Sequence, residues 1–470
     1  MKEVWRKEGV AQHEQRLAIS DPDDFVFGQA PFPVCCGRGV QIGSGKVIPE
    51  INFTLPPMEI NPQTWPDVRQ QYAEIIESVC TRAVALDVAD LLVEFETLPP
   101  MTIHPQWGVE ITRLLADTLA AYHEKYGLQS ALRLTPNDCR DQERPPRMRS
   151  GPYWDSMVQL FHAAADAGAD LIAIESTGGK EVCDPGLMTA DLWQVVYALG
   201  VLAPRDMQFL WREIVSACRA TGIVPSGDTA CGFANTAMAL AEQRLLPRVF
   251  AAVVRVASVP RSQMAYAMGA VGPSKDCAYE GPYMKAIAGV PISMEGRTAA
   301  CAHLSPLGNI AQAVCDCWSN ESVQNVRLLG ASAPVVSLEQ LAYDCRLLNV
   351  AARSREHALL LRDWLVASDA VLDPQAFVLR PDVVLQIAGE IIQEDNPYRQ
   401  VRRAVQTTLT LLRAAHRDGR VRIPPVEVRW LDRMERDADR LPDTETAFCE
   451  AMHAFLQDVS YLPEEYGLDA

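Results

Sequence analysis

Short apolar runs rich in β-branched residues alternate with longer segments of helical periodicity between about residues 85 and 335. The apolar runs predict strands at 90–96, 130–134, 170–174, 222–225, 250–256, 290–294 and 326–329, with a further candidate near 46–53. The intervening segments predict helices at 108–122, 156–167, 191–199, 206–220 and 235–243. Repeated βα units of this kind imply a parallel sheet whose strands are joined by helical crossovers.

Seven or eight such units favour an α/β fold of the closed (β/α)8 type, a TIM barrel, over an open doubly wound sheet. In a barrel the active site lies on the loops at the carboxyl ends of the strands. Polar residues follow several of the predicted strands, including Glu96, Asp138, Glu175, Asp228 and Glu295. A carboxylate at the end of a buried strand is costly unless it is paired or binds a metal, so this pattern indicates where chemistry is expected.

Beyond residue 340 the strand-like runs end and amphipathic helices follow. They are predicted at 341–367, 381–393, 397–417, 426–440 and 444–459, separated by turns that contain Pro and Asp. We therefore expect a barrel catalytic domain with an N-terminal extension at residues 1–340. Residues 341–470 are expected to form a helical layer that packs on the barrel or makes a dimer interface.

Composition adds limits on the class of protein. Of 470 residues, 48% are apolar and 22% are charged, which is typical of a globular enzyme. The net charge of −17, without a concentrated basic stripe, disfavours nucleic-acid binding. The amino terminus lacks the apolar core of a secretory signal, and the longest apolar stretch, 192–204, is too short to span a bilayer. We expect a cytoplasmic protein that contacts no membrane.

Several familiar motifs are absent or incomplete. The thirteen cysteines show no CxxC spacing, and most are expected to be small buried side chains. The glycine-rich run 37–46 fails the P-loop pattern at Val40 and Val47, so a turn lining the barrel mouth is expected instead. A full GxSxG elbow and HExxH are missing. His104 and His303 are expected to make structural hydrogen bonds rather than to bind metal.

Two sets of residues are candidates for chemistry. Glu94 and Glu96 share one face of the strand predicted at 90–96, and the sequence leaves open whether that face points into the barrel or outward. Glu175, Cys231 and Cys277 lie in three different loops near strand-like runs. One carboxylate and two thiolates form a zinc-binding set with room for a fourth, exchangeable ligand. A strand-end carboxylate beside two buried thiols is the alternative.

Long phrases around these residues resemble the zinc-containing subunit of methanol:corrinoid methyltransferases of methylotrophic methanogens and acetogens. The phrases are GKVIPEINFTLP at 45–56, VEFETLPPMTIHPQW at 93–107, GDTACGFANT at 227–236, GPSKDCAYEGPY at 272–283, PISMEGRTAACAHLSPLGN at 291–309 and WSNESVQN at 318–325. They keep the family's order over residues 20–350, whereas the helical tail is less diagnostic.

The resemblance implies a TIM barrel whose zinc is held by Glu175, Cys231 and Cys277. It also implies one-carbon metabolism such as methanogenesis, and a small corrinoid-binding partner protein. The methyl group of methanol would pass to cob(I)alamin on that partner, because this chain lacks the DxHxxG motif of a cobalamin ligand. The zinc would polarise the methanol oxygen. A homodimer within a heterotetramer is expected.

Three carboxyl groups are candidates for a proton donor or a substrate-positioning residue: Asp228, Glu280 and Glu96. Two alternatives for the function stay open at this point. One is a related zinc methyltransferase that uses another methyl donor, such as a methoxylated aromatic compound. The other is a noncatalytic zinc-binding subunit of a corrinoid complex.

Overall fold

The computed structural model describes residues 16–55, 58–275, 277–295, 310, 313–314, 316–323, 327–328, 331–456 and 461–468, with backbone alone at 294–295, 318–323 and 327–328. The strands are β1 Gln29–Cys36, β2 Val40–Ser44, β3 Ile48–Thr54, β4 Asp90–Glu96, β5 Gln129–Thr135, β6 Leu171–Ile174, β7 Val224–Asp228, β8 Ser293–Glu295, β9 Cys317–Val323, β10 Arg327–Leu328 and β11 Ala331–Ser332.

The α-helices are α1 Trp65–Ala85, α2 Pro99–Ile103, α3 Pro105–Tyr126, α4 Pro152–Ala163, α5 Lys180–Thr189, α6 Leu192–Tyr197, α7 Ala203–Thr221, α8 Thr236–Glu242, α9 Arg248–Ala257, α10 Val259–Met268, α11 Gly281–Ala288, α13 Ala333–Ala351, α14 Arg355–Asp369, α15 Pro374–Phe377, α16 Pro381–Ile391, α17 Pro397–Arg417, α18 Pro425–Asp439 and α19 Glu445–Phe455. Two π-helical turns, η4 Ala198–Leu202 and η5 Cys231–Asn235, and three 3₁₀ turns, η2 Pro22–Asp24, η3 Cys139–Gln142 and η6 Pro463–Tyr466, complete the described elements.

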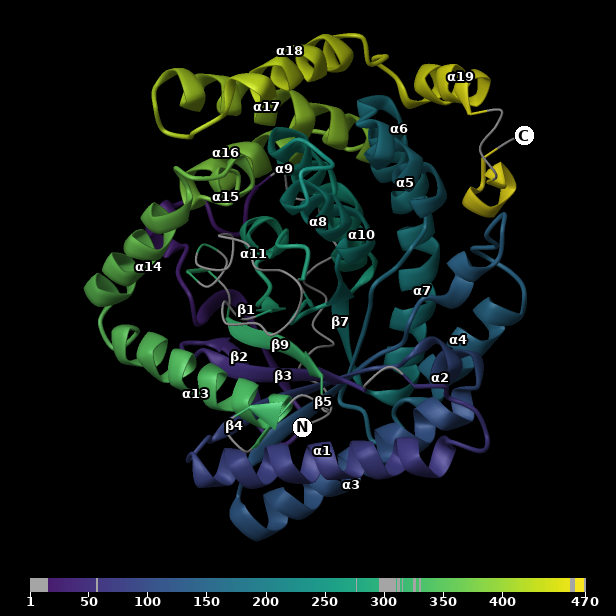
Figure 1. Cartoon of the computed structure of the whole chain (residues 1–470), viewed down its shortest axis with the longest axis vertical. Helices are drawn as coiled ribbons and strands as arrows, with labels where there is room; N and C mark the ends of the chain where they lie inside the picture. The colour runs from purple at the N-terminus through teal and green to yellow at the C-terminus, as the bar shows by residue number, and fades with distance from the viewer. Residues whose placement is uncertain are drawn as a thin grey trace.

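Seven parallel strands form the central sheet in the order β7-β6-β5-β4-β3-β9-β8, with helices packed around it (Figure 1). The strand β3 pairs with β4 on one side and with β9 on the other. The sheet therefore runs around the molecule in chain order, as the strands of a TIM barrel do. The α/β class and the barrel order of the strands agree with the sequence prediction.

The regular ladder does not close between β7 and β8. Residues 271–274 bridge this gap: the Val271 amide donates to the Pro225 carbonyl at 2.9 Å, and the Ser274 amide donates to the Pro291 carbonyl at 3.1 Å. The Ser293 amide in turn donates to the Ser274 carbonyl at 2.8 Å. This short segment thus occupies the place of an eighth strand, although its pairing is irregular.

The strand predicted at 250–256 is wrong, because these residues lie in helix α9. A short, continuously apolar run does not distinguish a buried strand from a buried helix by periodicity. Every residue of 249–257 is buried, since α9 packs against α8, α15, α17 and α18. Arg248 and Arg255, seven positions apart, share one face of the helix, but the window 250–256 contains only the second of them and so shows no period.

Three further boundaries also differ from the prediction. The strand expected at 326–329 is the small antiparallel pair β10–β11, while the barrel strand is β9, which lies earlier. The strand expected at 222–225 continues to Asp228. The helix expected at 341–367 is broken, because Ser354 adopts an extended backbone conformation between α13 and α14.

The strands have two apolar faces that belong to separate clusters. Ile48, Leu92, Ala131 and Leu171 lie in a small cluster inside the barrel, whereas the residues at alternate positions belong to the large cluster between strands and helices. The hairpin β1–β2 contributes to the inner cluster and so closes the amino-terminal end of the barrel. The expectation of a mouth-lining turn at 37–46 was therefore wrong, because the run forms this hairpin at the opposite end.

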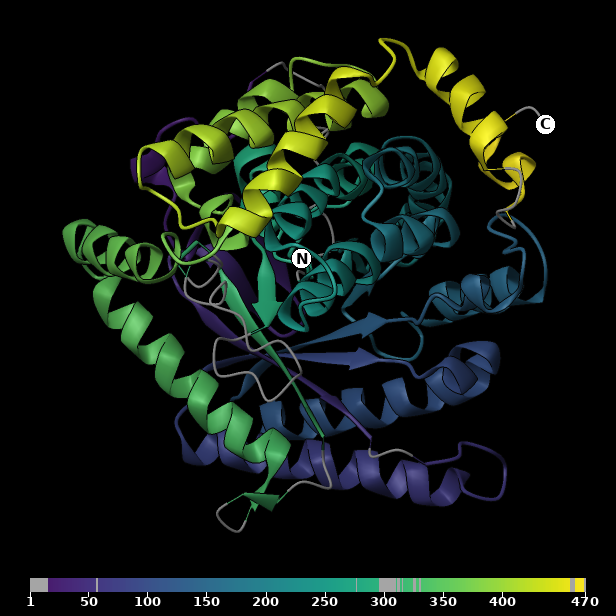
Figure 2. The ribbon, with the colours of Figure 1, turned by 45° about the horizontal axis from the view of Figure 1, so that its top comes forward.

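The helices after β9 differ in what they cover. Helix α13 packs against β3 and β9 as a barrel helix does, although it crosses residue 340. Helices α15 to α18 form an outer layer over α9, α11 and η4 (Figure 2). The proposed division at residue 340 stays a prediction. Within the described residues, no helix is both long enough and apolar enough to cross a bilayer.

Candidate metal centre

The three metal-ligand candidates come from loops at the carboxyl end of the barrel. Glu175 directly follows β6, and Cys231 is the first residue of η5, the turn that leads into α8. Cys277 lies between the bridging segment 271–274 and α11. Because the carboxyl ends of parallel strands meet at one end of a barrel, residues far apart in sequence come together here.

The carboxylate and the two thiols form one compact group. One ligand atom from each of Glu175, Cys231 and Cys277 lies within 4.8 Å of the others, the one such group of three among the described residues. The Cys277 Sγ lies 3.0 Å from Glu175 Oε1. Hydrogen bonding to Cys231 and burial raise the pKa of the Cys277 thiol well above its usual value.

This geometry fits a zinc ion. Zinc bonds of about 2.3 Å to sulfur and about 2.1 Å to oxygen place tetrahedral ligand atoms roughly 3.6 Å apart. Thiols that bind a metal lose their protons, so the three groups would then all be anions. A divalent cation between them would offset their mutual repulsion. Cys231 begins a helical segment, whose N-terminal dipole favours the thiolate form. The side-chain amide of Asn235 donates from Nδ2 to Cys231 Sγ at 3.5 Å.

Lys275 connects the ligand carboxylate to two other carboxylates. Its Nζ lies 2.7 Å from Glu175 Oε1 and 3.7 Å from Glu94 Oε1, and it also forms an ion pair with Glu96. Glu94 and Glu96 therefore face the inside of the barrel. Lys275 and Glu94 are buried, whereas the side chains of Glu96 and Glu175 are 29% and 30% exposed, so these two carboxylates remain in reach of solvent.

Asp228 is a buried anchor at the end of β7. Its Oδ1 lies 2.9 Å from the Arg261 guanidinium and accepts from the Ser176 amide at 3.3 Å. Its Oδ2 accepts from the Trp211 indole at 3.1 Å. Burial raises the pKa of Asp228, and Arg261 opposes that shift. Asp228 thus holds the residue that follows Glu175.

Glu280 is a buried anchor for the Cys231 loop. Its Oε1 accepts from the Ala230 amide at 2.6 Å and from the Ser262 hydroxyl at 2.8 Å. Ala230 directly precedes Cys231. The structure therefore places two of the three acid candidates, Asp228 and Glu280, against the loops that carry ligands, and it places Glu96 beside Lys275.

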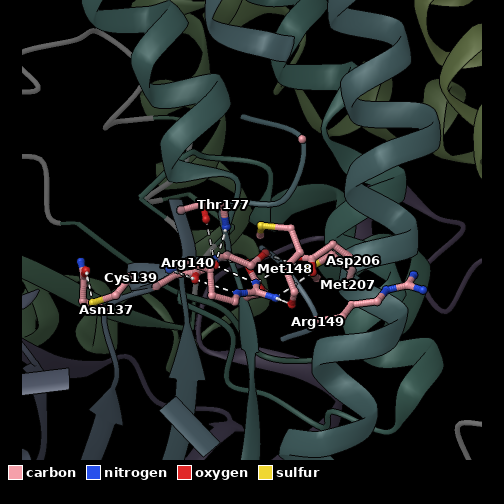
Figure 3. Close-up of polar contacts among 12 residues, drawn as sticks. Asn137, Cys139, Arg140, Met148, Arg149, Thr177, Asp206 and Met207 are labelled. Carbon is pink, nitrogen blue, oxygen red and sulfur yellow. Dashed lines mark hydrogen bonds and ion pairs between the residues drawn. The ribbon is translucent and has the colours of Figure 1, made fainter. Parts of the chain in front are cut away.

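A buried ionic network that the sequence analysis missed supports the Glu175 loop. The Thr177 amide donates to Asp138 Oδ2 at 2.9 Å, and the Arg140 guanidinium donates to both Asp138 and Asp206. Figure 3 shows Arg140 between Thr177 and Asp206 in this network. Burial opposes ionisation of Asp138, but Arg140 outweighs it and lowers the pKa of that carboxyl. Asp138 follows β5, and its position at a strand end was the available signal.

A second missed residue, Arg255, supports the Cys277 loop. This buried arginine on α9 donates to the Ala278 carbonyl, and its guanidinium lies 5.3 Å from the centre of the Tyr279 ring. It also donates to Gln375 Oε1 at 3.1 Å. The apolar run at 250–256 predicts a strand, so the sequence gives no signal for this contact.

The histidines contribute no ligand to the described site. His104 ends α2, and its ring centre lies 4.7 Å from that of Trp107. It is not part of any potential metal-binding group within the described part of the chain. His303 lies outside the described residues.

Comparison with known proteins gives concordant results from sequence and structure. The family model described as methanol-cobalamin methyltransferase B subunit matches residues 11–467. A methanol–corrinoid protein co-methyltransferase of Methanosarcina barkeri (strain Fusaro) is 34% identical over 463 residues, covering 97% of this chain and 99% of the relative. The crystal structure of the methanol:cobalamin methyltransferase complex MtaBC from Methanosarcina barkeri matches with a TM-score of 0.92 at 33% identity, over 97% of this chain and 99% of that one. The chain therefore belongs to the methanol-cobalamin methyltransferase B subunit family.

Proposed function

We propose that this chain transfers the methyl group of methanol to the cobalt of a corrinoid carried by a partner protein. The family and the name of the 34% identical relative support this reaction. The structural observation that carries the proposal is the group formed by Glu175, Cys231 and Cys277 at the carboxyl end of the barrel. It offers three protein ligands, the number found at catalytic zinc sites that keep a position for substrate.

Glu175, Cys231 and Cys277 would hold a zinc ion. When bound there, zinc supplies Lewis acidity toward the oxygen of methanol, whose hydroxide is otherwise a poor leaving group. The protein's own contribution is to hold the ligand loops in place. Asp228 and Glu280 do this through the amides of Ser176 and Ala230.

The balanced reaction consumes a proton. Methanol, cob(I)alamin and one proton give methylcob(III)alamin and water: the cobalt lone pair forms the Co–C bond, and the C–O pair leaves with the oxygen. Glu96 is our candidate to deliver that proton, which its carboxylate would first take from the Lys275 ammonium paired with it. It is partly exposed and forms an ion pair with Lys275, which also contacts the ligand Glu175.

We also propose that the corrinoid protein meets this chain at the carboxyl end of the barrel, where the ligand group lies. The relative of known structure is described as a methanol:cobalamin methyltransferase complex, MtaBC. A homodimer within a heterotetramer and a place in methanogenesis rest on the family resemblance, whereas a cytoplasmic location stays an expectation from the sequence.

The test uses the full-length chain, purified and loaded with zinc. It is mixed with free cob(I)alamin and with methanol or a methoxylated aromatic compound, and methylcobalamin formation is followed by absorbance. We expect methylation with methanol that stops after chelation and returns with added zinc. A zinc-loaded protein that methylates cob(I)alamin from the aromatic ether and not from methanol would disprove the substrate. Failure with every donor, with the native partner present, would favour a noncatalytic subunit.

A further inference from the structure

The carboxyl-terminal turn of the chain reaches the loop that carries the Glu175 ligand. The hydroxyl of Tyr466, in η6, accepts a hydrogen bond from the Gly179 amide at 2.9 Å. The same hydroxyl donates to Glu181 Oε1 at 2.6 Å. Tyr466 is fully buried although it lies close to the end of the chain. Its hydroxyl therefore satisfies an amide at the start of α5, as a capping side chain would.

Polar contacts from the barrel hold this turn in place on both sides. The Glu465 carboxylate accepts from the Arg149 amide at 2.6 Å and from the Ser150 hydroxyl at 2.9 Å. Arg205 on α7 donates to the Gly467 carbonyl at 3.3 Å. In Figure 2 the carboxyl-terminal segment lies beside the loop that leads into α4. The turn is thus docked on the loops that follow β5 and β6.

The loop from Glu175 to Gly179 is held by hydrogen bonds to its backbone amides. The Ser176 amide bonds to Asp228 and the Thr177 amide to Asp138, both of which belong to the barrel. The Gly179 amide bonds to Tyr466, which comes from the end of the chain. Gly178 cannot carry a larger side chain, because an added Cβ would lie 2.4 Å from the Asp206 side chain.

We propose that Tyr466 is a positioning residue of the metal centre, and that docking of the carboxyl-terminal turn orients the Glu175 carboxylate for the metal. This inference rests on the proposed metal site. Groups hydrogen-bonded directly to a metal ligand typically change metal affinity by about 10–100-fold when they are removed. Tyr466 acts through the backbone of the ligand loop, so an effect at the lower end of that range is expected. Loss of the Tyr466 hydroxyl releases the far end of the loop and leaves the Gly179 amide without its partner in a buried place. The ligand carboxylate then samples more orientations.

The test is a Co²⁺ titration of the metal-free, full-length protein, read from the thiolate-to-cobalt absorption bands. The variant Tyr466→Phe keeps the ring and removes the hydroxyl. The matched control is Tyr461→Phe, which also removes a hydroxyl from the carboxyl-terminal segment. The Tyr461 hydroxyl lies 3.4 Å from the Tyr197 hydroxyl, whereas that of Tyr466 contacts the Glu175 loop. We expect Tyr466→Phe to weaken Co²⁺ binding roughly tenfold and to alter the bands at saturation. Tyr461→Phe should change neither.

Unchanged affinity and bands in a folded Tyr466→Phe protein would overturn the inference. If that variant does not fold, Glu465→Gln replaces it, because it weakens docking of the turn without touching the loop. We then expect a smaller loss of affinity in the same direction, and no loss would again overturn the inference. A wild-type protein that binds no Co²⁺ would instead disprove the proposed metal site.

Discussion

The Cys277 Sγ lies 3.0 Å from the Glu175 Oε1, although 102 positions separate the two residues in the chain. This contact joins the loop after β6 to the loop before α11. The loop that carries Cys231 lies between them in the sequence. Two groups that both become anions when ionised are stable at this distance only with a proton or a cation between them. In the absence of metal, the raised pKa of Cys277 keeps that thiol protonated.

Loss of one thiol should weaken metal binding. We expect Cys231→Ser to reduce zinc affinity by at least 10–100-fold, the loss typical of removing a group that only supports a ligand. Zinc per chain is measured by mass spectrometry after dialysis, and the fold by circular dichroism. The control is Cys35→Ser, at an exposed cysteine far from the group. Full zinc occupancy in Cys231→Ser would contradict the assignment of this ligand.

The buried ion pair between Asp228 and Arg261 should contribute to the stability of the fold. We expect Asp228→Asn to lower the free energy of unfolding by about 3–5 kcal/mol, because the buried Arg261 loses its counter-charge. Urea unfolding followed by circular dichroism measures the change. The control is Glu339→Gln, which breaks the half-exposed pair with Arg82 and should cost less than about 1 kcal/mol. Equal effects of the two substitutions would show that the buried pair contributes no more than a surface pair.

Glu96 should affect turnover rather than metal content. Removal of a general acid typically lowers a rate by about 10²–10⁴-fold, so we expect a decrease of that order in kcat for Glu96→Gln, with zinc per chain unchanged. The assay is methylation of cob(I)alamin from methanol. Glu124→Gln, at an exposed site on α3, is the control and should behave as wild type. A kcat within twofold of wild type would remove Glu96 from the mechanism.

Stability should fall as the pH rises from about 4.5 to about 7 because of Glu181. Burial raises the pKa of Glu181 from 4.5 to about 7, so the folded protein retains a proton that the unfolded chain has lost. The contribution of Glu181 to the free energy of unfolding is fully present below about pH 4.5 and is lost as the pH rises through about 7. The loss is on the order of 3 kcal/mol.

Comparison of wild type with Glu181→Gln by urea unfolding at pH 5 and pH 8 tests this expectation. The glutamine cannot ionise, so the variant should gain stability relative to wild type at pH 8 compared with pH 5. The difference between the two proteins isolates Glu181 from the other titrating groups. An equal difference at both pH values would contradict the raised pKa.

Some elements could be predicted from the sequence because their signals are local. The strand 90–96 and the helix 397–417 have the predicted bounds. The first is a strand rich in apolar residues, and the second begins with Pro397 after the capping residue Asn396 and carries an amphipathic pattern. The candidates Glu175, Cys231 and Cys277 were likewise recognisable, because their residue types suit zinc and their phrases resemble a known family.

Other features depend on contacts between distant parts of the chain. Residues 250–256 read as a strand because their apolar run has no visible period, and packing on several sides decides that they form α9. The bridging segment 271–274 was not predicted, since its bonds to β7 and β8 depend on the closing of the barrel. Lys275 stood in a recognised phrase, yet its three carboxylate partners come from β4 and the loop after β6.

The sequence by itself determined the first five strands of the central sheet, β3 to β7, the net negative charge and the identity of the residues able to bind zinc. These depend on residue type and on spacing within a few turns of chain. Only the tertiary structure decided that the carboxylate and the two thiols meet within 4.8 Å. It also placed Tyr466 against the Gly179 amide, because a hydrogen bond between residues 287 positions apart leaves no local pattern in either segment.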